Sequence, residues 1–66
     1  MLINEIGEAA GHIWHTLDEE GPLRLTALKK QIDASDIVLC MALGWLAREG
    51  KIDMEADGRT YRVQLK

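Results

Sequence analysis

The chain has one cysteine, one proline and fewer basic than acidic residues among its 66 positions. Cys40 has no partner in the chain, so no internal disulfide can form, and a lone thiol is typical of the reducing cytosol, where we expect the protein. Eight lysines and arginines stand against eleven aspartates and glutamates, a formal net charge of −3. The chain as a whole therefore offers little of the positive charge that holds duplex DNA.

A long apolar stretch and recognisable catalytic motifs are also missing. The longest apolar run, Ile37–Leu46, is far too short to cross a bilayer, and the first residues do not resemble a signal peptide. We find no nucleophile motif, no glycine-rich phosphate loop and no pair of carboxylates with an obvious pocket. We therefore expect no membrane contact, no enzymatic activity, no cofactor and no small-molecule ligand.

The spacing of apolar residues predicts a first helix over residues 4–17. Gly21-Pro22 is a strong stop signal soon after its end. The buried face that this spacing predicts consists of Ile3, Ile6, Ala10, Ile13, Trp14 and Leu17.

A short extended segment, Leu23–Leu25, and a brief second helix come next. Thr26 is expected to cap this helix, because its hydroxyl can accept a hydrogen bond from a free backbone N–H. The helix should bury Leu28 and Ile32 and end near Asp33. Aspartate tolerates the left-handed conformation, so it can turn the chain there without a glycine.

A third helix is predicted from Ser35 to about Glu49. Serine is a favoured N-cap, Asp36 suits the positive end of the helix dipole, and Gly50 is a C-terminal stop. The side expected to face the core carries Leu39, Ala42, Leu43 and Leu46.

The last fifteen residues predict a β-hairpin, because apolar and polar residues alternate in two runs around Asp57-Gly58. With these two residues as the turn, both inner pairs are apolar, and a pair on the opposite face joins opposite charges. The predicted pairs are Ala56 with Arg59, Met54 with Tyr61, Ile52 with Val63, and Asp53 with Arg62.

This order of elements predicts an α+β fold, a winged helix-turn-helix with three helices, a C-terminal β-hairpin wing and a short extra strand. We expect residues 1–66 to form one domain. A domain of this size buries only about 60% of its unfolded surface, so dimerisation would help to stabilise it.

Several segments resemble a small winged helix-turn-helix family of short bacterial and archaeal chains, largely uncharacterised. The resemblance rests mainly on Ala42–Ile52, which reads ALGWLAREGKI, and on Gly11–Trp14 with Leu17 and Gly21-Pro22. Leu28–Lys30 adds to it. The resemblance implies the fold, and the wider superfamily implies DNA binding through the third helix.

The outward side of the third helix allows two interpretations. Ile37, Met41 and Trp45 follow at intervals of four residues, so they line up on one side. Gly44 lies between them. A glycine inside a helix lowers helix stability by about 1 kcal/mol relative to alanine, and a close approach of another backbone at this position would explain that cost. We predict a protein interface here, with a second copy in a homodimer or with another protein. Alternatively, Trp45 packs on the hairpin and these residues are core.

DNA binding is the competing function. Base reading uses Arg, Lys, Asn or Gln, and this outward side offers only Arg48. Asp36 also occupies the helix N-terminus, where a phosphate would otherwise bind. If DNA is bound, we expect the contacts to come from Lys29, Lys30, Arg48 and Arg59.

Glycine and histidine pairs on the first helix are interpreted as structural. Gly7 and Gly11 could admit a neighbouring helix, but a crowded position inside the domain is the favoured interpretation over a dimer contact. Glu8, His12 and His15 superficially resemble a metal site. The chain has no further histidine to complete it, so we predict no metal.

Overall fold

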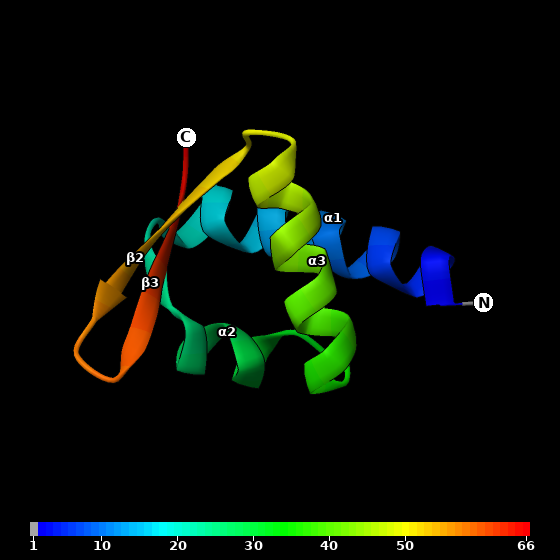
Figure 1. Ribbon diagram of the computed structural model, residues 1–66, viewed down its shortest axis with the longest axis horizontal. Coiled ribbons are helices and arrows are strands. Elements are labelled where there is room, and N and C mark those ends of the chain that lie inside the picture. Colours follow the sequence, from blue (N-terminus) through cyan, green and yellow to red (C-terminus); the bar gives the residue numbers. More distant parts are fainter. Residues whose placement is uncertain (1) are drawn as a thin grey trace.

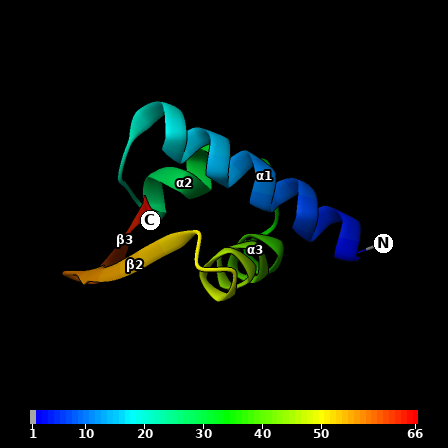
Figure 2. The same ribbon diagram turned by 90° about the horizontal axis from the view of Figure 1, so that it is seen from above.

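The computed structural model describes residues 2–66, and Met1 lies outside the described residues. Along this part of the chain the order is α1, β1, α2, α3, β2 and β3. Figures 1 and 2 show α3 crossing α1, and the β2–β3 hairpin extending to one side of the helices. Three helices with a three-stranded antiparallel sheet confirm the predicted α+β winged arrangement.

Helix α1 spans Leu2–Glu20, longer than the predicted 4–17. The helix continues through its acidic end because nothing interrupts it before Gly21. There φ is +81°, a conformation that favours glycine, and the N–H of Gly21 donates to the carbonyl of Leu17 at 2.9 Å. The prediction that Ile3 and Trp14 are buried is wrong. Ile3 is 73% exposed, and Trp14, which lies at the border of the buried strip, is 37% exposed.

Strand β1 is only Leu23–Arg24, and helix α2 follows at once as Leu25–Gln31. Two local predictions are wrong here. The N-cap is Arg24 rather than Thr26, and its side chain makes no capping hydrogen bond, because pairing with β3 fixes Arg24 in an extended conformation immediately before the helix. Asp33 does not turn left-handed, since every described residue with positive φ is a glycine.

Strands β2 (Ile52–Asp57) and β3 (Thr60–Leu65) form the wing, and the sheet order is β1-β3-β2. The turn residues are Gly58 and Arg59, not Asp57 and Gly58. Only Gly58 has positive φ, +67°, which fits a turn with glycine first, whereas the predicted turn needs positive φ at two successive residues.

The shifted turn moves every cross-strand partner by two residues. Met54 lies opposite Val63 instead of Tyr61, and Arg62 lies opposite Glu55 instead of Asp53. A shift of two residues keeps each side chain on its predicted face, so the apolar face of the hairpin is still the inner one.

The core lies between α1, α3 and the inner face of the sheet, with α2 closing one end. It confirms the predicted inward residues of α2 and α3. Its members are Ala9, Ala10, Ile13, Leu17, Leu28, Ile32, Val38, Leu39, Ala42, Leu43, Leu46, Ile52 and Val63. Within residues 2–66, no helix combines the length and apolar character that crossing a membrane requires.

Candidate interaction surface

Helix α3 (Asp36–Arg48) is held at both ends, which fixes the direction of its side chains. The hydroxyl of Ser35 accepts a hydrogen bond from the N–H of Val38 at 3.2 Å, as the sequence predicts. At the other end Gly50 has φ +71°, and the N–H of Lys51 donates to the carbonyl of Leu46 at 3.0 Å. A positive φ at Gly50 with this hydrogen bond is typical of a Schellman motif. The backbone of α3 is therefore fixed at both ends, which determines which of its residues face outward.

This outward side is apolar and open to solvent. Ile37 is 66% exposed, Met41 42% and Trp45 55%, so the alternative in which these residues are core is wrong. The hairpin leaves Trp45 uncovered because it extends to the side of the helices instead of folding over α3. The four residues Ile37, Met41, Gly44 and Trp45 thus lie together on one face, which we call the α3 face.

The α3 face continues onto α1 through a groove that neither helix fills. Its volume is about 360 Å³, and Trp14 of α1 and Trp45 of α3 both line it. Gly7 and Gly11 form part of its α1 wall. Ile3 lies one helical turn before Gly7, on the same flank of α1. The two tryptophans, distant in sequence, therefore border one groove, whose lining also includes His15 and Lys51.

The glycines of this surface have no role in packing the domain itself. A side-chain carbon built on Gly7, Gly11 or Gly44 would meet no atom within 4 Å, and none of the three has positive φ. The interpretation of Gly7 and Gly11 as a crowded position inside the domain is therefore wrong. They lie on α1 where no other element covers it.

The residues proposed for DNA contact are spread around the domain and partly neutralised. Lys29 of α2 pairs with Asp36 of α3, with Nζ and Oδ1 3.4 Å apart. Lys30 and Arg48 are exposed on two different helices, and Arg59 is at the tip of the wing. Among the described residues, none of these three forms an ion pair.

The wing itself is a poor partner for phosphates. Glu55 lies opposite Arg62 on its outer face, and Asp57 accepts a hydrogen bond from Nε of Arg24 at 3.1 Å. On its other face Met54 and Tyr61 are exposed beyond the helices. The tip therefore offers Arg59 beside carboxylates and apolar side chains, rather than a basic patch.

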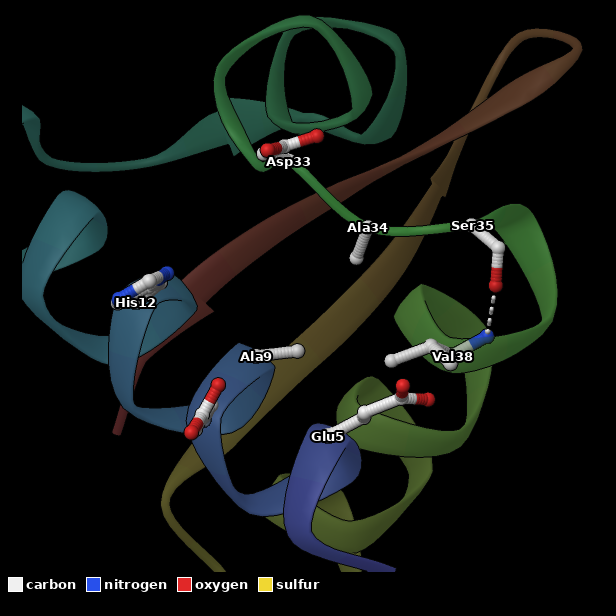
Figure 3. Close-up of a pocket in the computed structure, with 8 residues that line it drawn as sticks. Glu5, Ala9, His12, Asp33, Ala34, Ser35 and Val38 are labelled. Carbon is white, nitrogen blue, oxygen red and sulfur yellow. Dashed lines mark hydrogen bonds between the residues drawn. The ribbon is translucent and has the colours of Figure 1, made fainter. Parts of the chain in front are cut away.

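A second hollow, of about 440 Å³, lies between α1 and the segment that joins α2 to α3 (Figure 3). It is acidic, with Glu5, Glu8 and Asp33 among its lining residues, and His12 also lines it. His15 instead lines the groove beside Trp14, so the three residues of the apparent metal motif do not converge. Among residues 2–66, no group of three or more such side chains is placed to hold a metal ion.

Sequence reasoning missed the α1 half of the apolar surface. Ile3 and Trp14 were assigned to the core because their spacing matches the buried stripe. Helical spacing alone does not distinguish the border of a buried strip from its centre. The acidic hollow was missed because Glu5 and Asp33 come from segments far apart in the chain.

Three helices, a three-stranded sheet and a hairpin wing define the winged helix-turn-helix class, whose members typically bind DNA. Within this class the chain belongs to the family described as Winged helix-turn-helix domain (DUF2582), which matches residues 1–65.

The chain is also similar to an archaeal protein, Uncharacterized protein MJ1608 of Methanocaldococcus jannaschii. The two are 34% identical over 64 residues, which cover 94% of this chain and 91% of the relative. No solved structure matches the chain. The predicted resemblance is thus confirmed.

Proposed function

We propose that the protein is a non-enzymatic winged helix module that binds another protein chain through the α3 face. In winged helix domains this is the helix that enters the major groove. Here the same position carries large exposed apolar side chains, and that single observation carries the proposal. The proposed setting is the cytosol, where the exposed thiol of Cys40 stays reduced.

A protein partner and a DNA partner differ in the binding free energy that this surface would supply. Burying Ile37, Met41 and Trp45 removes apolar area from water, which is the main favourable term in protein association. Against a DNA groove the same side chains would displace water from base edges without supplying hydrogen bonds. Arg48 is the one basic side chain on this side of α3, and the net charge of −3 adds repulsion. Protein contact is therefore the better use of this surface.

An amide NMR titration with a generic DNA duplex at low salt tests the proposal. We expect the amide resonances of α3 and of the wing to keep their chemical shifts when DNA is added. DNA binding would instead shift the amides of α3, the Lys29–Lys30 pair and Arg59 together, and these shifts would fade steeply as salt is added. That result would overturn the proposal in favour of DNA recognition.

Photo-crosslinking in cells that express the protein tests directly whether the α3 face contacts another protein. A photoreactive residue at position 37, on the α3 face, should capture protein, whereas the same residue at the exposed control position 30 on α2 should not. Equal capture at both positions would show that contact through the α3 face is not specific. Crosslinks from position 37 to DNA alone would contradict protein binding.

A further inference from the structure

We infer that the α3 face binds an acidic segment of another protein, one that carries carboxylates beside a large apolar side chain. The apolar side chain would enter the groove between Trp14 and Trp45, and the carboxylates would pair with Arg48 and Lys51. This inference rests on the proposed function and names the chemistry of its partner. The distribution of charge around the crossing of α1 and α3 carries it.

Two hollows beside this crossing differ in charge. The hollow of about 440 Å³ is lined by three carboxylates, those of Glu5, Glu8 and Asp33, and by no lysine or arginine. The groove of about 360 Å³ has Lys51 and His15 in its lining, and no carboxylate is among the described residues that line it. The chain as a whole has more acidic than basic residues, so this groove departs from its average. The groove therefore suits an anionic partner, whereas the other hollow does not.

Arg48 adds a second cation beside the α3 wall of the groove. It follows Gly44 by four residues and Trp45 by three, so its side chain neighbours both on the helix surface. Arg48 and Lys51 are exposed, and neither forms an ion pair with a described residue. Glu49 follows Arg48 in the chain, but it does not line the groove and pairs with neither cation. Both cations are thus accessible to carboxylates of a partner.

The walls of the groove suit a large apolar side chain. Trp14 and Trp45 form part of them, and Gly7 and Gly11 leave the α1 side without side chains. A side-chain carbon built on either glycine would meet no atom within 4 Å, so the space above them is open. Tryptophan is among the residues that contribute most to binding at protein interfaces. A leucine or an aromatic residue of the partner would fill this space, with its neighbouring carboxylates at the charged border.

Selection from a displayed library of random short peptides, with the folded domain as bait, tests the inference. We expect the selected peptides to combine leucine or an aromatic residue with nearby aspartate or glutamate. With the double variant Arg48→Glu and Lys51→Glu as bait, the same library should yield apolar peptides with lysine or arginine instead. The control, Lys30→Glu with Arg59→Glu, makes the same change in net charge on α2 and at the wing tip, and should keep the acidic preference.

The two tryptophans of the chain locate the bound peptide. When a synthetic copy of a selected peptide is added, the indole N–H signals of Trp14 and Trp45 should both shift. The double charge variant should bind this peptide at least about tenfold more weakly, because two attractive contacts become repulsive. The dispersion of the amide spectrum checks that each variant is folded.

Gly11→Leu keeps the test decisive if the charge reversal unfolds the domain. Leucine favours the helix over glycine and its first side-chain carbon meets open space, so the variant should be at least as stable as the original chain. Its side chain would occupy the groove and should weaken peptide binding by a similar factor. A stable variant with undiminished binding would place the peptide elsewhere and contradict the inference.

Other results would also overturn it. They are a selection that enriches no peptide, one that enriches peptides without acidic residues, and an acidic preference that the double charge variant leaves unchanged. Indole signals that shift with the concentration of the chain itself would assign the groove to a second copy instead. If one of these results is obtained while position 37 still captures protein, the inference fails and the proposed function stands. If position 37 captures only DNA, the proposed function fails as well.

Discussion

The two sides of α3 are both apolar, yet only one of them is used by the fold. The inward side, with Leu39 and Leu43, is almost fully buried against α1 and the sheet. The outward side, with Ile37 and Met41, faces solvent. Burial explains the apolar residues of the first side completely. The apolar residues of the second side are not explained by burial within the domain, and the proposed protein contact rests on them.

The outer face of the sheet shows what an ordinary surface of this chain looks like. It is polar and joined by exposed ion pairs, Arg24 with Asp57 at 3.1 Å and Lys66 with Asp53 at 3.8 Å. This solvent-facing surface of the chain is therefore polar and charged. The α3 face differs from this polar outer face, as do the exposed Met54 and Tyr61 on the other face of the wing.

The largest expected effect comes from testing the two sides of α3 directly. Leu39→Ala should lower the free energy of unfolding by about 2–5 kcal/mol, because it leaves a cavity among closely packed residues. Ile37→Ala is the matched control on the other side, and under dilute conditions it should change that free energy by less than about 0.5 kcal/mol. Chemical denaturation of both variants measures the difference. Equal losses would mean that Ile37 is buried in the folded chain.

A smaller effect, of opposite sign for stability and for association, is expected at Gly44. Gly44→Ala should raise the free energy of unfolding of the dilute chain by about 1 kcal/mol, because alanine favours the helix and its methyl group meets open space. If the α3 face binds a partner chain as proposed, the same methyl group should weaken that binding, because it separates the two backbones. Denaturation of the dilute chain and photo-crosslinking from position 37 measure the two quantities.

The reverse change provides the control for Gly44. Ala47→Gly, also exposed on α3 but on the side turned away from Trp45, should destabilise the chain by about 1 kcal/mol without altering association. Unchanged association in Gly44→Ala would contradict a close backbone approach at that position.

The smallest effect concerns the charged border of the α3 face. Lys29→Gln removes the exposed ion pair with Asp36, and we expect the free energy of unfolding to fall by less than about 0.5 kcal/mol. Lys30→Gln, one residue along, is the control and should leave this free energy unchanged. A large loss of stability would show that this pair matters to the fold itself.

Much of the fold could be predicted because its signals are local. Ser35 caps α3, Gly50 ends it, and alternation in the last fifteen residues marks both strands of the wing. The hairpin register could not be derived in the same way. The two possible turns differ by two residues in pairing, and both place Met54 and Val63 on the inner face, so the apolar pattern does not distinguish them.

The limits of the interaction surface were harder to predict for a different reason. Helical spacing shows which way a residue points, but not how wide the buried strip is. Trp14 and Trp45 lie at the border of that strip, and their exposure depends on how closely α1 and α3 pack beside them. Sequence reasoning therefore identified the α3 face as one of two alternatives and misplaced Ile3 and Trp14.

The order of the strands has a consequence for solubility at high concentration. Since β3 is central, β2 is an edge strand, with unpaired backbone groups along Ile52–Asp57 that could extend the sheet into another molecule. Every second residue of this strand is acidic: Asp53, Glu55 and Asp57. Asp57 pairs with Arg24 and Asp53 with Lys66, so charged side chains of both signs cover the outer side of this edge and discourage strand-to-strand pairing. The exposed apolar side chains of α3 are therefore not accompanied by an apolar outer face along the open sheet edge.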